Sequence, residues 1–308
     1  MSAVGVDIGG TKLLAGLVDP DGSVVARRRL RTPPEGGAAV AAAVVEVVRA
    51  LWQEAGSGPL PVGVGAAGLV DLGGTVRYSP NIPGWDGTPL RAELSAVLGI
   101  DVSVDNDANA AAWGEFRAGA GRHAEGSLLM LTVGTGIGGG LVQGGAPLRG
   151  REGLAAEFGH MIVREGGPPC GCGNHGCLEA LASGSAIARV AREGLARGAE
   201  SALAGIAEPS GKDVTRAAED GDDFACAVLR ECGFWLGVGI ASLVNALDPE
   251  LVVVGGGAMQ AGELLLAPAR AAFAERVIGA AQRRLPLVAP ATLGDDAGMV
   301  GAALLAPR

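Results

Sequence analysis

The chain repeats one arrangement of short apolar runs and glycine-rich turns in its two halves. In the first half, apolar residues at 4–6 precede a Gly-Gly turn and a returning run at 13–18. In the second half, a run at 128–133 leads into the glycines of 134–140 and returns at 141–143. Helical stretches and a later apolar run that ends in glycines follow in each half. This duplication in layout predicts two similar α/β domains with a cleft between them.

Turn signals and hydrophobic periodicity locate the remaining elements. Residues 19–22 form a strong turn signal, so we expect the first strands to form a three-stranded meander. The expected helices are 38–55, 90–98, 110–118, 186–197, 213–219, 223–247 and 295–306, and the further strands are 24–28, 62–64, 101–104 and 251–254.

Charge and composition exclude several classes of protein. The net charge is −9 and the only dense basic run is 27–29, which argues against a nucleic-acid groove. The N-terminus lacks the features of a signal peptide, and no apolar run approaches membrane-spanning length. We therefore expect a soluble, cytoplasmic protein without nucleic-acid or membrane partners. In that reducing compartment its five cysteines would not form a disulfide framework.

The first glycine turn carries groups that suit phosphate binding. Gly9 and Gly10 let backbone N–H groups approach phosphate oxygens. Thr11 adds a hydroxyl, Lys12 a positive charge, and Asp7 a carboxylate able to face Mg²⁺. A plain hairpin turn is the alternative, but it needs neither Asp7 nor Thr11 beside the glycines.

The second glycine turn matches a dinucleotide-binding spacing in an unsuitable context. Gly134, Gly136 and Gly139 fit G-x-G-x-x-G, a motif that should open directly into a helix. Here a strand is expected instead, which argues against a nicotinamide dehydrogenase. The chain also lacks a G-x-x-x-x-G-K-[ST] motif, so it is not a P-loop enzyme.

A run of acids and amides marks a predicted strand-to-helix junction at 105–109. A carboxylate there, such as Asp107, could take the proton of a hydroxyl nucleophile, as phosphoryl transfer requires. Asn106 could hold neighbouring hydroxyls. Helix capping explains such residues equally well, and the residues alone leave both interpretations open.

Cys170, Cys172 and Cys177 lie close together in a glycine-rich loop and suit tetrahedral Zn²⁺. A fourth ligand is required, and both His160 and His175 are candidates. Two acids flank this loop, and carboxylates can accept hydrogen bonds from the neighbouring hydroxyls of a sugar.

Together these features resemble the ROK family of sugar kinases, in particular its bacterial glucokinases, over nearly the whole chain. The resemblance is carried by 7–12, Asn106 with Asp107, 134–140, Glu157 with His160, the cysteine motif 170–179, and 255–257. It implies two actin-like, hexokinase-like (ribonuclease H-like) α/β domains, each with a mixed five-stranded sheet. The implied limits are 1–108 plus the C-terminal helix 296–308, and 109–295 with a zinc loop at 160–179.

The resemblance also implies a role for each matching residue. Asp107 would be the catalytic base. The sugar would be held by Asn81, Asn106, Asp107, Glu157, His160 and Glu179. Structural Zn²⁺ would be held by His160, Cys170, Cys172 and Cys177, which leaves His175 outside the set. ATP with Mg²⁺ would be held by Asp7, Gly9, Gly10, Thr11, Lys12, Gly134, Thr135, Gly136, Gly255, Gly256 and Gly257.

The implied activity is ATP-dependent phosphorylation of a hexose, with glucose to glucose 6-phosphate as the first expectation. Mannose, fructose or N-acetylmannosamine are alternative acceptors, and polyphosphate is an alternative donor, although polyphosphate-using relatives lack the cysteine cluster. A sugar-sensing ROK transcriptional regulator would carry a helix-turn-helix domain before the first glycine motif, and only six residues precede Asp7. A homodimer or homotetramer is expected.

Overall fold

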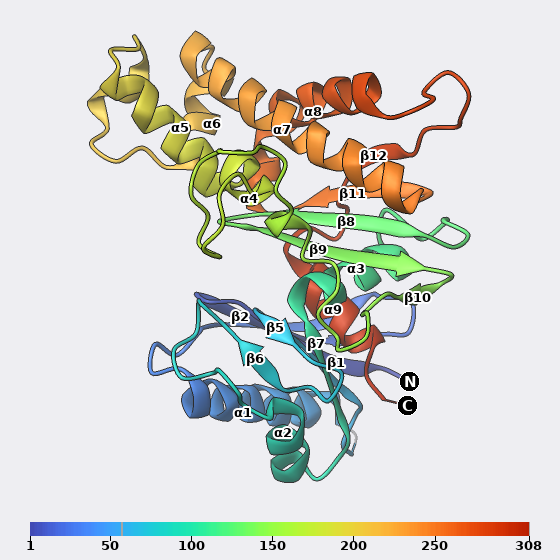
Figure 1. Cartoon of the computed structure of the whole chain (residues 1–308). Helices are drawn as coiled ribbons and strands as arrows, with labels where there is room; N and C mark the ends of the chain where they lie inside the picture. Colours follow the sequence, from blue (N-terminus) through green and yellow to red (C-terminus); the bar gives the residue numbers. More distant parts are fainter. Residues whose placement is uncertain (57, 308) are drawn as a thin grey trace. The chain divides into compact units, whose positions relative to one another are not determined.

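The computed structural model describes residues 1–56 and 58–307, and its chain divides into two compact units (Figure 1). Unit 1 comprises Met1–Met130, Gly140–Ala156 and the segment from Ala291 onward, and unit 2 comprises Leu131–Gly139 and Glu157–Pro290. The compact units therefore keep residues 109–130 and 140–156 with the N-terminal part. The domain limits given by the resemblance stay a prediction, because compactness and duplication need not divide a chain at the same residue.

The first sheet has the strand order β3-β2-β1-β4-β7. Its strands are β1 (Ala3–Ile8), β2 (Lys12–Val18), β3 (Val24–Arg31), β4 (Val62–Ala66) and β7 (Val102–Asn106). The first three form the expected antiparallel meander, while β4 and β7 join in parallel. Apart from Asp7 in β1, strands β1 and β4 are apolar and buried on both faces, as is usual where parallel strands are covered on each side.

The second sheet repeats this order as β10-β9-β8-β11-β12. Its strands are β8 (Leu128–Val133), β9 (Ile137–Gln143), β10 (Ala146–Pro147), β11 (Leu251–Gly255) and β12 (Leu287–Pro290). It is also mixed, because β10 pairs antiparallel with β9 and β11 pairs parallel with β12. The predicted α/β class with two mixed five-stranded sheets is confirmed. Strand β9 begins earlier than expected and includes three of the glycines.

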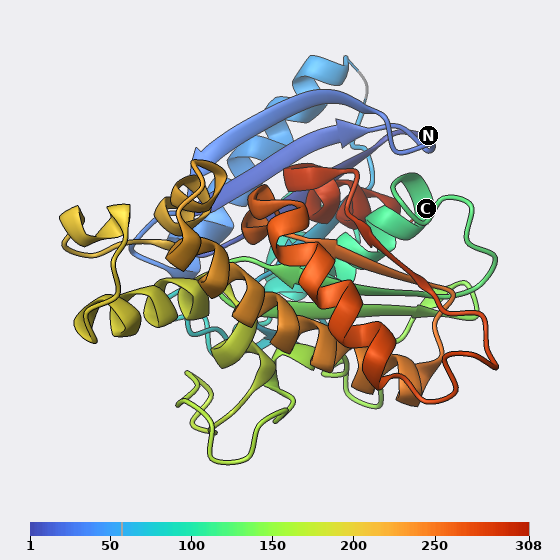
Figure 2. The same cartoon turned by 90° about the horizontal axis from the view of Figure 1, so that it is seen from above.

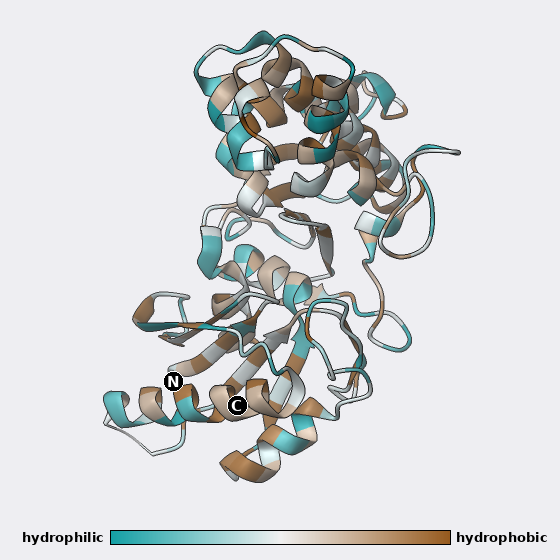
Figure 3. Ribbon diagram, turned by 90° about the vertical axis from the view of Figure 1, so that its left-hand side faces the viewer, coloured by the Kyte–Doolittle hydropathy of each residue, from teal (hydrophilic) through white to brown (hydrophobic). Residues whose placement is uncertain are grey.

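Helices and a small hairpin complete unit 1. The helices are α1 (Gly37–Ala55), α2 (Leu90–Leu98), α3 (Asp107–Ala118) and α9 (Ala297–Leu304), and the hairpin pairs β5 (Leu69–Val70) with β6 (Val76–Tyr78). Helix α1 buries a helical-period set, Val40, Val44, Val47, Val48 and Leu51. Figure 3 shows helices that carry both hydrophobic and hydrophilic residues, as expected of helices that each cover a core with one face.

Helices α3 and α9 approach one another at backbone distance. A methyl group added at Gly114 would lie 2.5 Å from the carbonyl oxygen of Ala297, and one at Gly301 would overlap the carbonyl oxygen of Ala110. Glycine is required at both positions for this close contact. The base-bearing helix of the predicted site is therefore packed directly against the C-terminal helix of the same unit.

Unit 2 carries five α-helices within its described residues. They are α4 (Leu178–Ala182), α5 (Gly184–Ala196), α6 (Gly211–Glu219), α7 (Asp223–Leu247) and α8 (Glu263–Arg276). Helices α7 and α8 lie side by side (Figure 2). Short 3-10 turns occur at Phe158–His160, Ala202–Gly205 and Gly257–Ala261, and in unit 1 at Gly294–Asp296.

Helix α7 is long and apolar enough to cross a membrane by length and composition alone. The expectation that no apolar segment approaches this length is therefore wrong. However, 61% of its most apolar window is buried inside the structure, as in the core helix of a soluble protein. Helices α4, α5, α6 and α8 all contact it, so burial against protein explains its composition.

Candidate active site

At the junction between β7 and α3, the helix cap and the predicted catalytic base are two different residues. Asn106 is the cap residue: its Oδ1 accepts hydrogen bonds from the backbone N–H groups of Ala108 at 2.8 Å and Asn109 at 3.0 Å. Its Nδ2 donates to the carbonyl oxygen of Gly68 at 2.9 Å. Asp107 is the first residue of the helix and accepts only the N–H of Ala108, at 2.9 Å, among the hydrogen bonds of the described chain. The capping alternative thus applies to Asn106, and the Asp107 carboxylate is left for another task.

Two carboxylates of unit 1 lie near one another at this junction. Burial raises the pKa of Asp107, although the Ala108 N–H lowers it. Burial, and then the Asp107 charge, raise the pKa of Asp7 to about 7, against the opposing effect of Lys12. Lys12 Nζ in turn lies 2.7 Å from a carboxylate oxygen of Asp295. A pair of carboxylates beside a lysine can serve both proton transfer and cation binding.

The first glycine turn brings a further predicted residue to this side of unit 1. The turn is closed by a hydrogen bond from the Gly9 N–H to the Lys12 carbonyl oxygen, at 2.9 Å. A methyl group added at Gly10 would lie 2.8 Å from the Cβ of Asn81. Asn81, expected near the sugar, therefore lies against the turn expected to bind phosphate, and a side chain at Gly10 would displace it.

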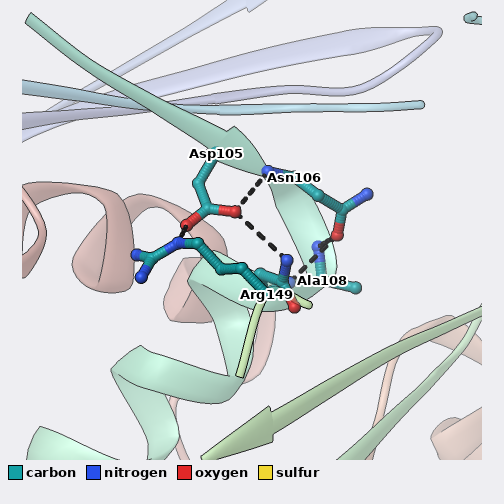
Figure 4. A network of polar contacts seen from close by, with 5 residues as sticks. Asp105, Asn106, Ala108 and Arg149 are labelled. Carbon is teal, nitrogen blue, oxygen red and sulfur yellow. Dashed lines mark hydrogen bonds and ion pairs between the residues drawn. The ribbon is translucent and has the colours of Figure 1, made fainter. Parts of the chain in front are cut away.

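A partly buried ion pair lies at the same junction (Figure 4). Asp105 is 8% exposed, and its Oδ2 accepts a hydrogen bond from Arg149 Nε at 2.7 Å. Its Oδ1 accepts from the N–H of Asn106 at 2.8 Å and from Asn109 Nδ2 at 3.1 Å. Sequence reasoning missed Arg149, because no motif marks it and the pairing joins residues 44 positions apart.

Unit 2 contains a cluster of three thiols and one imidazole. The ligand atoms of His160, Cys170, Cys172 and Cys177 all lie within 4.8 Å of one another. His160 Nδ1 lies 3.6 Å from Cys170 Sγ, and Cys172 Sγ lies 3.7 Å from Cys177 Sγ. Exposed His175 is not in the cluster; its backbone pairs with Pro169 instead. Of the two candidate histidines, the structure thus brings only His160 to the three thiols.

The surroundings of the three thiols shift their pKa values in different directions, and burial raises that of Cys177. Burial raises the pKa of Cys170 to about 12. The pKa of Cys172 is lowered to about 7: burial opposes this, but hydrogen bonds led by the Asn174 N–H, and the nearby His160, outweigh it. Three sulfur atoms and one imidazole nitrogen at these separations form a donor set that fits tetrahedral Zn²⁺.

Glu179 connects the cysteine loop to the second glycine turn. It follows Cys177 by two residues and lies in the first turn of α4. Its Oε2 accepts a hydrogen bond from the Ile137 N–H at 2.9 Å, and its Oε1 lies 3.6 Å from Cys170 Sγ. A methyl group added at Gly136 would overlap the Glu179 carboxylate. The glycine at 136 is therefore required for this acid to reach the turn.

A single 3-10 turn brings Glu157 and His160 together. The His160 N–H donates to the Glu157 carbonyl oxygen at 3.0 Å. A methyl group added at Gly159 would overlap the Ile137 carbonyl oxygen, so this turn packs directly on the start of β9. Ala156, immediately before Glu157, has a φ of 70°, a left-handed conformation that is uncommon for alanine.

The two predicted nucleotide loops of unit 2 meet at the end of β8. Gly256 has a φ of 89°, and a methyl group there would lie 2.5 Å from the Val133 carbonyl oxygen. Gly134, the next residue after Val133, accepts a hydrogen bond from the Gly184 N–H at 2.8 Å. The start of α5 therefore contacts the loop at 134–136.

The family model of the ROK family matches residues 3–308. The chain belongs to the ROK family. Among curated ROK relatives, a glucokinase of Streptomyces coelicolor is 41% identical, over 98% of this chain and 96% of its own. An N-acetylmannosamine kinase of Escherichia coli is 34% identical, over 99% and 98%. A ROK glucokinase from Streptomyces griseus, solved with glucose and AMPPNP, is 40% identical with a TM-score of 0.88, over 99% of both chains.

Proposed function

We propose that this ROK protein transfers the γ-phosphoryl group of ATP to glucose, giving glucose 6-phosphate and ADP. The observation that carries the proposal is the full-length similarity, at 40% identity, to a glucokinase solved with glucose and AMPPNP. The arrangement at the start of α3 supports it, because Asn106 caps the helix and leaves a partly buried carboxylate at Asp107.

Asp107 is the proposed general base. Its pKa is raised by burial, which makes the carboxylate a better proton acceptor. As the sugar oxygen attacks the γ-phosphorus, its O–H proton passes to Asp107 while the bond between the γ-phosphorus and the bridging oxygen breaks. ADP leaves with the electrons of that bond. Exclusion of water protects the phosphoryl group from hydrolysis.

The glycine turns are the proposed phosphate sites. Residues 9–11 of unit 1 and 134–136 of unit 2 expose backbone N–H groups in turns without bulky side chains. The loop at 255–257 would approach the adenosine. Asp7, with Lys12 nearby, would face Mg²⁺, which neutralises charge on the nucleotide phosphates when bound.

The proposed sugar ligands offer amide, carboxylate and imidazole groups for the hydroxyls. They are Asn81, Asn106, Glu157, His160 and Glu179, as the resemblance implies. Zn²⁺ on His160, Cys170, Cys172 and Cys177 would fix the loop that carries these unit 2 groups and would take no part in the chemistry.

A coupled assay of ADP release over a sugar panel tests the proposal. Glucose, mannose, fructose and N-acetylmannosamine are compared as acceptors, with ATP and polyphosphate as donors. We expect the highest kcat/KM with glucose and ATP. A preference for N-acetylmannosamine would match the second group of curated relatives and reassign the substrate.

The homodimer or homotetramer, the cytoplasmic location and the lack of nucleic-acid and membrane partners stay predictions. Light scattering on the purified protein distinguishes a dimer from a tetramer. Fractionation of cells tests the location, and binding to DNA fragments or lipid vesicles tests the excluded partners.

A further inference from the structure

The Asp105 carboxylate organises the β7–α3 junction at which Asp107 lies. It occupies the penultimate position of β7 and is almost completely buried. It accepts the Asn106 N–H on one side of Asp107 (Figure 4). On the other side it accepts the side-chain N–H of Asn109. The carboxylate therefore clamps the residues before and after Asp107 without touching the base itself.

The side chain of Asn109 keeps its hydrogen bond to Asp105 even though its own oxygen then lacks a partner among the described residues. Its side chain is 2% exposed, and its Nδ2 must face Asp105, because a carboxylate can only accept. Its Oδ1 is left without a hydrogen-bond partner within residues 1–56 and 58–307. A buried amide oxygen without a partner is unfavourable, so the contact to Asp105 outweighs that loss.

Arg149 makes the buried Asp105 carboxylate possible. It reaches the carboxylate from the segment after β10, with Nε 2.7 Å from Oδ2 and a side chain that is one-third exposed. The Ala155 N–H donates a hydrogen bond to the Arg149 carbonyl oxygen at 3.1 Å, and this bond fixes the backbone that carries the arginine. A buried carboxylate that loses its cation is strongly unfavourable, and it would move towards water.

Asn106 and Asp107 depend on this support to different degrees. The Asn106 side chain has anchors of its own at Gly68, Ala108 and Asn109. The Asp107 carboxylate accepts the Ala108 N–H, which Asn106 also accepts. Its orientation otherwise depends on the backbone that Asp105 holds. Loosening of the clamp should therefore disturb the orientation of the base more than that of the sugar-binding amide.

We propose that Arg149 is a positioning residue for phosphoryl transfer: its ion pair with Asp105 holds the β7–α3 junction so that the Asp107 carboxylate is correctly oriented. This inference rests on the proposed function, in which Asp107 is the base. Arg149 itself need not contact the sugar or the nucleotide.

A double-mutant cycle tests this role. Arg149→Met leaves Asp105 without its cation, and we expect kcat to fall about 10- to 100-fold, with a much smaller change in KM for glucose. Asp105→Asn alone sets an amide N–H₂ against the arginine. The double variant removes both charges and keeps an oxygen for Asn106, so its kcat should exceed that of either single variant. Arg151→Met, an exposed arginine two residues away, is the matched control.

Two kinetic results on Arg149→Met would overturn the proposal. One is a kcat for Arg149→Met equal to that of the Arg151→Met control. The other is a large rise in KM for glucose or ATP with kcat unchanged, which would mean direct ligand binding by Arg149. Independent, multiplicative effects in the cycle would likewise exclude coupling through the ion pair.

Amide hydrogen exchange separates this inference from the proposed function. In Arg149→Met, peptides that cover 105–110 should exchange faster than in wild type, with no change in Arg151→Met. This measurement needs no activity. Unchanged exchange at 105–110 refutes the clamp, even if the protein is an active kinase. A wild-type protein that is inactive on every sugar refutes the proposed function. In that case the exchange result alone decides whether the clamp exists.

Discussion

Neighbouring residues at the start of α3 have separate tasks. Asn106 uses its side-chain oxygen to cap the helix, and Asp107 is held as a partly buried carboxylate with a raised pKa. A carboxylate in the first helical turn is also favoured by the helix dipole, which limits how far burial can raise its pKa. Burial therefore makes Asp107 a better proton acceptor than an exposed aspartate, and the helix dipole acts in the opposite direction.

Asp107→Asn should remove turnover while sugar binding persists. The amide has the same shape and cannot accept the proton, and loss of a general base costs about 10²- to 10⁴-fold in rate. Steady-state assays give kcat, and calorimetry gives the glucose affinity. Turnover within a few-fold of wild type would exclude Asp107 as the base.

Gly298, at the start of α9, limits the space around Asp7. A methyl group there would lie between 2.8 and 3.0 Å from the atoms of the Asp7 carboxylate. Gly298→Ala should displace that carboxylate and lower kcat/KM for MgATP by about 10- to 100-fold. Gly205→Ala, where the added methyl group meets nothing within 4 Å, is the control. Equal activity in the two variants would contradict a role for the Asp7 position.

At the scale of elements, Glu115 joins α3 to the segment that leads into α9. It is fully buried and accepts the N–H groups of Ala120 and Leu293, each at 2.7 Å. The N–H and hydroxyl of Thr292 also reach it, at 3.2 Å. Glu115→Ala leaves these donors unpaired, and we expect a loss of about 3 kcal/mol in the free energy of unfolding. Urea titration measures this loss, and a loss below about 1 kcal/mol, the level of an ordinary exposed contact, would contradict it.

The cysteine loop is the second element with a testable role. Cys172→Ser should release zinc, because a serine hydroxyl is a poor substitute for thiolate, and it should weaken sugar binding through loss of loop order. Cys226→Ser is the control, since this thiol lies in α7 outside the cluster. Elemental analysis of both variants gives the metal content. Unchanged zinc in Cys172→Ser would refute the proposed ligand set.

Element bounds were predictable where local signals were strong. Helices α2 and α7 and strand β8 have the bounds that periodicity predicts. Helix α8 was missed because Pro268 lies inside it, and proline disfavours a helix interior. In the structure the Pro268 ring packs against Gly233 of α7, so a tertiary contact overrides the local signal. Strand β12 was missed because it has four residues beside prolines.

The site was predictable where adjacent residues carry the signal. The cysteine motif and the glycine turns could be located from spacing, while the choice of His160 over His175 came from resemblance. Contacts between distant segments were not predictable. The pairing of Arg149 with Asp105 and that of Lys12 with Asp295 depend on how the chain folds back, which one sequence does not reveal.

For the whole molecule, Asp7 makes stability depend on pH. Burial, and then Asp107, raise its pKa from 3.8 to about 7. Between these values the folded state retains a proton that the unfolded state has lost, so this residue destabilises the fold increasingly as pH rises. Asp7→Asn cannot ionise, so its gain in unfolding free energy over wild type should be smallest below pH 4 and should level off above pH 7. Urea titrations across this range, with exposed Glu219→Gln as control, measure the gain; a gain that is flat or falls with pH would show that the pKa of Asp7 is not raised.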